Sequence, residues 1–140
     1  MLLKLPAAWL MGVKVSMINN SKCICTLKYK WINQNPFKSI FWAAQGMAAE
    51  FTTGALLMRE IELSKKNISM LLIDVEAKFK KKAVGKISFK CEKGLIIKEK
   101  VNSLNPDKKK STIWIDSIGI DENGQEVSKF KFNWSILLKD

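Results

Sequence analysis

Hydrophobic and polar residues alternate along most of the second half of the chain. The clearest alternation covers residues 127–138, where aromatic and aliphatic side chains oppose lysine, asparagine and serine. Because successive side chains of a strand point to opposite faces, this pattern predicts a strand with one buried face. Weaker alternations cover residues 71–80, 86–91 and 112–121. This half of the chain therefore predicts about four strands, and residues 95–104 predict a short helix.

The first 30 residues predict a short helix followed by a β-hairpin. Residues 2–11 form an amphipathic pattern that ends at Gly12, a plausible helix cap. Apolar residues then alternate with polar ones over residues 13–17, and again over residues 22–30. The Asn19-Asn20-Ser21 segment between them is a turn signal. We therefore expect two paired strands with one buried face.

A long stretch between these regions is almost free of charge. From Ser39 to Met58 the one charged residue is Glu50. The stretch is too long and too rich in alanine for a strand, so it predicts a helix that runs to about Glu60. Ser39 is a suitable N-cap for this helix. Apolar residues surround most of its circumference, which is typical of a buried helix.

The uncharged stretch has the length of a membrane span but not its composition. Gln45, Glu50 and two threonines would lie in hydrocarbon, where a charge costs about 3 kcal/mol. We expect no membrane span and instead a helix wrapped by a curved sheet. This is an α+β fold with an antiparallel sheet and one helix across its concave face. The length of 140 residues is typical of a single domain, here residues 1–140.

The charge of the chain is strongly positive but comes almost entirely from lysine. The formal net charge is +11, and Arg59 is the single arginine. Arginine dominates specific contacts with bases, so we do not expect a nucleic-acid reader. The lysine excess reflects either a lysine-rich host proteome or a field that attracts phosphorylated small molecules or an anionic surface.

Histidine is absent from the sequence, and only three cysteines are present. The absence of histidine excludes the Ser-His-Asp arrangement and removes the commonest metal ligand. The cysteine spacing argues against a disulfide framework and a zinc site, so we expect neither a metal nor a resident cofactor. Acid–base chemistry must then depend on a carboxylate, a lysine, Tyr29, a cysteine or bound water. The cysteine content fits a reducing cytoplasm best.

Glu50 is the strongest candidate for chemistry. A carboxylate in apolar surroundings must find a partner, take up a proton or act chemically. With a raised pKa it could activate water as a general base. The alternative is a helix carboxylate that a lysine or threonine satisfies. Thr53 lies three residues later on the same side of the helix and is a candidate partner of Glu50 as well as a candidate substrate-binding residue.

Two segments resemble a known family. Asn35-Pro36-Phe37-Lys38-Ser39-Ile40-Phe41 and Ala43-Ala44-Gln45-Gly46-Met47-Ala48-Ala49-Glu50 resemble the entry to the central helix of hotdog-fold proteins. The likeness is to the uncharacterised bacterial branch of the thioesterase-like hotdog superfamily, and residues 113–131 resemble the end of that fold. The resemblance implies a hotdog domain in a homodimer or dimer of dimers. It also implies hydrolysis of an acyl-coenzyme A or acyl-carrier thioester at the dimer interface.

The resemblance also suggests roles for individual residues. Glu50 would be the catalytic carboxylate, while Asn35 and Ser39 would lie at the substrate where a loop meets the helix. Gln45 would touch the ligand or bridge protomers, unless it is a buried amide bonded to backbone. The alternative for Asn35 is a turn-forming role before proline. Ser39 to Trp42 stand where many hotdog families carry a His-Gly-Gly type entry.

Two further alternatives remain open at the level of the sequence. One is a non-catalytic hotdog protein that binds an acyl group or another small hydrophobic ligand. The other is binding of nucleic acid or a membrane surface through the lysines. Coenzyme A enters as part of the substrate, with the lysine runs at 78–82 and 108–110 as candidate phosphate contacts.

Overall fold

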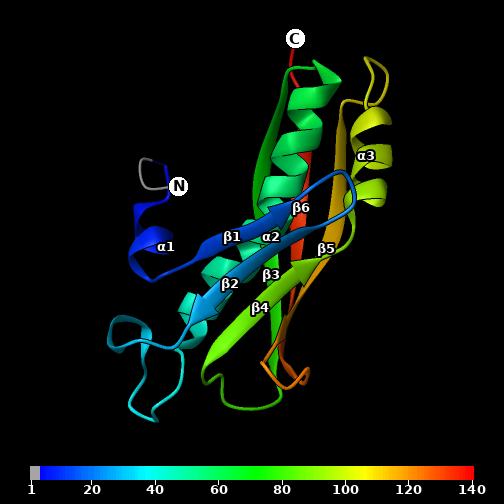
Figure 1. The fold of residues 1–140 in the computed structure, drawn as a ribbon. Helices are drawn as coiled ribbons and strands as arrows, with labels where there is room; N and C mark the ends of the chain where they lie inside the picture. Colours follow the sequence, from blue (N-terminus) through cyan, green and yellow to red (C-terminus); the bar gives the residue numbers. More distant parts are fainter. Residues whose placement is uncertain (1–3) are drawn as a thin grey trace.

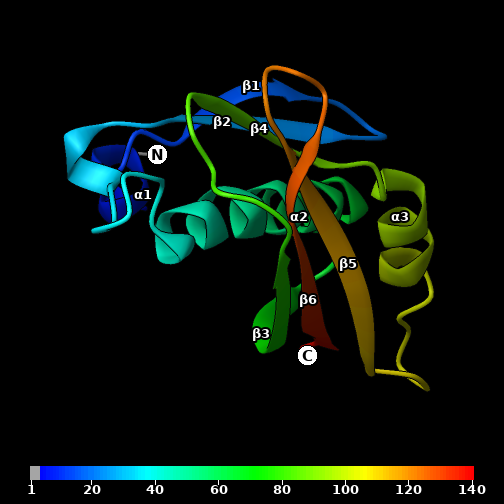
Figure 2. The ribbon, with the colours of Figure 1, turned by 90° about the horizontal axis from the view of Figure 1, so that it is seen from below.

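The computed structural model describes residues 4–140. A six-stranded antiparallel sheet has the order β1-β2-β4-β5-β6-β3. The strands are β1 (Lys14–Ile18), β2 (Cys23–Lys28), β3 (Ile68–Phe79), β4 (Lys86–Cys91), β5 (Lys110–Ile120) and β6 (Glu126–Leu138). The helices are α1 (Pro6–Leu10), α2 (Trp42–Ser64), α3 (Gly94–Asn102) and a short 3₁₀ turn, η1 (Trp31–Asn33). The expected α+β fold is confirmed: the sheet curves around α2, and α3 lies beside one end of that helix (Figure 1; Figure 2).

Small residues allow α2 to lie close to the sheet. Ala44, Ala48 and Ala49 are almost completely buried, and the helix contacts β2, β4, β5 and β6. An alanine side chain adds little radius to a helix, so the surrounding strands can approach its backbone closely. The alanine-rich stretch identified in the sequence is therefore the centre of the core.

The helix α2 begins later than the sequence predicts. It starts at Trp42, and Ser39 makes no capping hydrogen bond to it, so the expected N-cap is wrong. The chain is still extended at Ile40 and Phe41, whose amides donate to the carbonyl oxygens of Ala83 and Asn33 at 2.8 Å. These long-range bonds hold the backbone out of helical geometry until Trp42.

The end of α2 and the N-terminal helix also differ from expectation. Lys65, with a φ of 60°, ends α2 in left-handed geometry one turn beyond the predicted end near Glu60. The first helix covers only Pro6–Leu10, and Gly12, with a φ of 92°, turns the chain into β1. Residues 2 and 3 of its predicted range lie outside the described residues.

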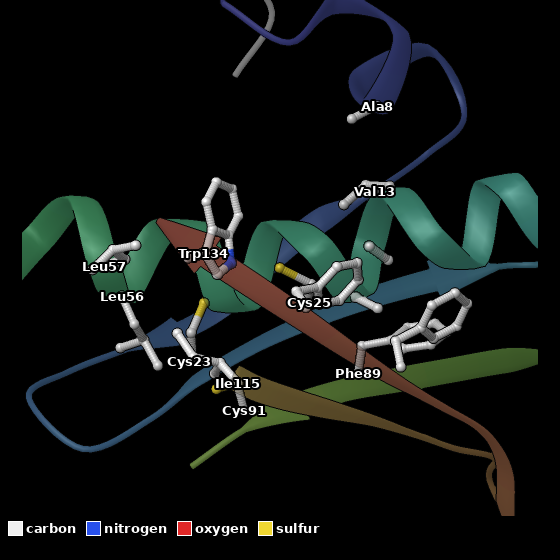
Figure 3. Packing of buried hydrophobic residues seen from close by; sticks show 14 of the residues in the cluster. Ala8, Val13, Cys23, Cys25, Leu56, Leu57, Phe89, Cys91, Ile115 and Trp134 are labelled. Atoms are coloured by element: carbon white, nitrogen blue, oxygen red, sulfur yellow. The ribbon is translucent and has the colours of Figure 1, made fainter. Parts of the chain in front are cut away.

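Strands from the middle of the sheet supply the rest of the core. The three cysteines are free and fully buried among apolar residues, as Figure 3 shows for Cys23, Cys25 and Cys91. Burial raises the pKa of Cys91 to about 12, which keeps this thiol protonated and unreactive. On β6 the alternation predicted a buried aromatic face, and Phe130 and Phe132 lie there as stacked rings. The cysteines and these aromatic rings therefore belong to one apolar core.

The two edge strands do not bury the apolar residues that their patterns offer. All five residues of β1 are exposed, and a bulge separates Val15 from Met17, so the buried face expected for this strand is wrong. On β3 the alternating residues Leu71 and Val75 are 65% and 52% exposed. Each edge strand has only one neighbour in the sheet, and within residues 4–140 these side chains stay exposed.

Candidate functional site

A cavity of about 560 Å³ borders α2 on the side of Glu50. Residues at helical spacing from Glu50 to Glu62 form one wall, because positions one turn apart share a helix face. Met70 of β3 and Trp134 of β6 form other parts of the lining, which is mostly apolar. The helix therefore presents its one mid-helix carboxylate to a cavity rather than to the packed core.

The Glu50 side chain is half-buried and unpaired. In residues 4–140 no side chain or backbone group forms a hydrogen bond or ion pair with its carboxylate. Burial raises the pKa of Glu50 above its ordinary value of 4.5, because desolvation penalises the charged form. Such a group can accept a proton from water close to neutral pH more readily than an exposed glutamate can.

Gly54 keeps the space beside this carboxylate open. It lies one turn after Glu50, and a Cβ placed on it would be 3.9 Å from Glu50 Oε1. The same Cβ would be 3.3 Å from the ring of Trp134, closer than most real contacts of this kind. The absence of a side chain at Gly54 therefore lets the indole approach α2 while the cavity stays accessible.

Thr53 contacts Glu50 through the backbone rather than through the carboxylate. Its hydroxyl donates to the backbone carbonyl oxygen of Glu50 at 3.0 Å. The hydroxyl oxygen of Thr53 in turn accepts a hydrogen bond of 3.0 Å from Nε1 of Trp134. Thr53 is fully buried, so it holds the indole that lines the cavity.

A second cavity, of about 510 Å³, lies at the N-terminal end of α2. Three of the predicted site residues line it together: Asn35, Ser39 and Gln45. The cavity also contains exposed aromatic residues, including Phe41 and Trp42. Within one protomer these three residues and Glu50 therefore line different cavities.

Asn35 and Ser39 form a closed turn. Asn35 Oδ1 accepts from the backbone amides of Phe37 at 2.9 Å and Ser39 at 3.3 Å. Asn35 Nδ2 donates to the Ser39 hydroxyl at 2.9 Å. This is the arrangement expected of a turn-forming asparagine, and it shapes the entrance to α2.

Gln45 is buried, and both ends of its amide are engaged. Its Nε2 donates to the carbonyl oxygen of Ile40 at 3.2 Å, and its Oε1 accepts from the Ser128 hydroxyl at 2.8 Å. These bonds tie the start of α2 to β6. A buried amide whose nitrogen and oxygen both have hydrogen-bond partners within the protein is typical of a structural role.

Free backbone donors lie beside these residues. The first two amides of α2, at Trp42 and Ala43, have no backbone acceptor within the described residues. The first amides of a helix lack intrahelical partners and carry the positive end of the helix dipole. This end of α2 can therefore bind a carbonyl oxygen or an anion.

The lysines around the second cavity are partly neutralised. Lys80 pairs with Glu126, and Lys81 pairs with Asp121 at 2.7 Å. The hydrogen bond from Lys81 holds the pKa of Asp121 below its ordinary range. Of the three lysines that line this cavity, Lys82 makes no ion pair within residues 4–140.

The lining of the Glu50 cavity includes Gly54, Arg59 and Trp134, for which the sequence suggested no role at a site. Helical spacing from Glu50 is a usable signal for Gly54, which lies about one turn further along α2, but not for Arg59, which lies two and a half turns further and half a turn out of phase. Trp134 belongs to the face of β6 that the alternation predicts to be buried, and its place at the cavity depends on how β6 crosses α2. No local pattern indicated that contact.

Two further features are absent from the described part of the chain. Residues 4–140 contain no cluster of three or more histidine, cysteine, aspartate or glutamate side chains placed to hold a metal ion. None of the described helices is long and apolar enough to cross a membrane.

The chain is similar to one described family and to several solved structures. The family described as "Domain of unknown function (DUF4442)" matches residues 1–136. No curated protein matches the sequence significantly. A Pseudomonas aeruginosa protein of unknown function, described as a probable thioesterase, has a TM-score of 0.84 at 15% identity, covering 99% of this chain and 91% of that chain.

Two further structures are described as thioesterases. A Staphylococcus aureus thioesterase carrying a glutamine-to-alanine change has a TM-score of 0.73 at 12% identity, with 94% of this chain and 98% of that chain covered. A Haemophilus influenzae thioesterase has a TM-score of 0.69 at 11% identity, covering 94% of this chain and 82% of that chain. At these identities the likeness shows the fold, and the expected hotdog fold is confirmed.

Proposed function

Because the chain belongs to the DUF4442 family and has the hotdog fold, we propose that it is a hydrolase of acyl thioesters, with acyl-coenzyme A or an acyl carrier as substrate. The observation that carries this proposal is the Glu50 carboxylate, unpaired and half-buried at the wall of an apolar cavity. A carboxylate in that position can activate water, and the cavity can hold an acyl group. The thioesterase descriptions of the similar structures support the reaction class.

One carboxylate can perform both proton transfers of the reaction. The Glu50 carboxylate takes a proton from water while the water oxygen adds to the thioester carbonyl carbon. The tetrahedral intermediate then releases the thiolate as the C–S bond breaks, and protonated Glu50 returns its proton to the sulfur. The products are a carboxylic acid and a free thiol. Backbone amides are suitable donors for the oxyanion of the intermediate.

We further propose that two protomers complete one site. Asn35, Ser39 and the free amides of α2 line a different cavity from Glu50 within one protomer. In a homodimer, the Glu50 cavity of one protomer would face the α2 entrance of its partner. The free amides of Trp42 and Ala43 would then stabilise the oxyanion, while Asn35 and Ser39 hold the turn that presents them.

The spacing of two residues supports this assignment. The S. aureus thioesterase has been solved with a glutamine changed at position 32 and, separately, with a glutamate changed at position 47 of that chain. Those positions are fifteen residues apart, the same separation as between Asn35 and Glu50 here. At this interval, an amide residue in the turn before α2 is followed by a carboxylate near the middle of the helix.

The exposed edge of β3 supports a dimer. An apolar strand with unpaired backbone groups tends to pair with another chain. Antiparallel pairing of two β3 strands would bury Leu71 and Val75 and join two sheets into one. A dimer of dimers remains compatible with the exposed convex face, which includes Trp114.

Three free buried cysteines fit a reducing compartment such as the cytoplasm.

A panel of acyl-coenzyme A substrates tests the proposal. We expect wild-type protein to release free thiol, and Glu50→Gln to reduce kcat by about 100-fold or more, because the general base is lost. Glu62→Gln is the matched control, since Glu62 lines the same cavity away from the proposed chemistry, and it should keep kcat within about threefold. Full hydrolysis by Glu50→Gln would contradict the assigned role.

A non-catalytic ligand-binding protein is the second candidate. The observation that favours it is the bulk of Phe41 and Trp42 at the entrance to α2, where a substrate carbonyl would have to approach the backbone. Saturable binding of fatty acids in calorimetry, with no thiol release from any thioester of the panel, would support binding over hydrolysis.

A further inference from the structure

Arg59 lies in the Glu50 cavity with an incomplete set of hydrogen bonds. Its Nη2 donates to Oδ1 of Asn20 at 2.7 Å. Its Nε is buried and has no acceptor within the described residues. An unpaired guanidinium donor inside a protein is costly, and native structures rarely retain one without a reason. Arg59 is also the single arginine of a chain that otherwise uses lysine for positive charge.

No carboxylate neutralises this guanidinium directly. In residues 4–140, Arg59 forms no ion pair, although Glu50 and Glu62 line the same cavity. Lys4 adds a second positive charge to the lining. A guanidinium that lines a cavity without a carboxylate partner can bind a carboxylate through two parallel N–H donors.

The cavity has different chemistry at different points along α2. Glu50 and Arg59 are nine residues apart, which corresponds to a helical rise of about 13 Å. The residues that line the cavity between them include Phe51, Ala55 and Met58, which are apolar. A ligand that follows this wall meets a carboxylate, then an apolar surface, then a guanidinium.

We propose that Arg59 binds the distal carboxylate of an acyl group whose thioester lies at Glu50. The substrate class is then the half-thioester of a medium-length dicarboxylic acid. An extended chain advances roughly 1.2 Å per bond, so the axial rise of about 13 Å corresponds to about ten or eleven bonds, counted from the thioester carbonyl carbon to a distal carboxylate oxygen. This inference rests on the proposed thioester hydrolysis for its chemistry, and on the cavity itself for the position of the anion.

Matched pairs of thioesters test the inference. Wild-type protein, Arg59→Gln, Arg59→Lys and Lys14→Gln are assayed with sebacoyl-coenzyme A against decanoyl-coenzyme A, which differ by the terminal carboxylate. Lys14→Gln is the control for loss of one positive charge, because Lys14 is exposed on β1 and does not line the cavity.

Wild-type protein should prefer the sebacoyl substrate by at least about tenfold in kcat/KM. Arg59→Gln should lose about 10- to 100-fold on that substrate, the range for one charge-assisted hydrogen bond, and less than threefold on decanoyl-coenzyme A. Arg59→Lys should retain part of the preference, and Lys14→Gln all of it. No preference in wild type, or an equal loss on both substrates in Arg59→Gln, would overturn the inference. The equal loss would indicate a contact with phosphates of the carrier.

Calorimetry with free sebacate and decanoate separates this inference from the proposed function. Arg59-dependent sebacate binding without hydrolysis of any thioester would refute the hydrolase and retain the anion site. Hydrolysis of both thioesters without preference would retain the hydrolase and refute the anion site. If Arg59→Gln does not fold, Arg59→Lys provides the comparison. Its loss of sebacate affinity relative to decanoate supports the inference, and unchanged selectivity overturns it.

Discussion

Nε1 of Trp134 donates a 3.0 Å hydrogen bond to the hydroxyl oxygen of Thr53, which joins β6 to α2 directly beside Glu50. Thr53 in turn donates to the carbonyl oxygen of Glu50, so one hydroxyl connects the helix, the sheet and the residue proposed to act on water. The indole also forms part of the cavity lining. Stability and function are therefore coupled at this point of the fold.

Replacing Thr53 with valine should destabilise the protein. The substitution leaves the buried indole N–H of Trp134 without an acceptor, which costs about 1–3 kcal/mol in the free energy of unfolding. Urea denaturation measures this loss. Thr53→Ser is the control, because it keeps the hydroxyl, and it should recover most of the difference. Equal losses in the two variants would show that packing, not the hydrogen bond, matters here.

Replacing Gly54 with alanine should affect the cavity more than the fold. The added methyl group would lie 3.3 Å from Trp134 and 3.9 Å from Glu50 Oε1, so it crowds the space beside the carboxylate. Alanine favours a helix by about 1 kcal/mol over glycine, which offsets the strain. We expect a change of less than about 1 kcal/mol in stability and a loss of about tenfold in acyl-ligand affinity.

Gly46→Ala is the matched control for this prediction. Gly46 is also in α2 and lines neither the Glu50 cavity nor the cavity at the helix entrance. A Cβ there would make an ordinary contact of 3.5 Å with Phe130. Ligand affinity should stay unchanged in Gly46→Ala, and a comparable drop in both variants would count against a role for Gly54 in the cavity.

Replacing Glu50 with glutamine should stabilise the protein at neutral pH. The folded state raises the pKa of Glu50, so it holds the proton more tightly than the unfolded chain does. The contribution of this group to stability is therefore intact below the ordinary pKa of 4.5 and decreases as the pH rises through the raised pKa. Glutamine avoids this decrease, and Tm at pH 7 should rise by about 2–4 °C.

The pH dependence distinguishes this effect from a general change in packing. The difference in Tm between Glu50→Gln and wild type should shrink as the pH is lowered below 4.5. Lys4, Arg59 and Glu62 line the same cavity, so Glu62→Gln is measured in parallel to identify a contribution from another carboxylate. A constant difference from pH 4 to pH 8 would refute desolvation of Glu50 as its cause.

Introducing a charge on the β3 edge should abolish the proposed dimer. Val75→Lys places a positive charge on a strand that would pair with its own copy, so two like charges would meet at the interface. The side chain is already exposed, and the fold of the protomer should persist. Light scattering with size-exclusion chromatography should show a dimer for wild type and a monomer for this variant. Leu95→Lys, at an exposed position on α3, is the control.

The predicted elements were most accurate where a single local pattern determined them. The alternation over residues 127–138 matched β6, and the alanine-rich stretch matched the core-facing part of α2. The pattern was less informative at the sheet edges, since β1 and β3 alternate like buried strands yet expose their apolar residues. Periodicity predicts which residues share a face, but not whether another element covers that face.

The residues of the candidate site likewise differ in how far the sequence alone identified them. Glu50 was recognisable because a lone carboxylate in an apolar helix is conspicuous in the sequence. The sequence did not indicate that Asn35 and Ser39 close a turn on each other, or that Gln45 bonds to Ser128, 83 residues away. Nor did it place the lone arginine beside the same cavity as Glu50.

The sequence by itself determined the elements, the buried helix and the chemical type of its central residue, because these depend on composition and spacing along a short segment. Tertiary structure alone decided the start of α2, the exposure of β3 and the set of side chains around Glu50. Each of these depends on contacts between residues far apart in the chain, such as Ile40 with Ala83 and Thr53 with Trp134. Such contacts exist only once the sheet has closed around the helix.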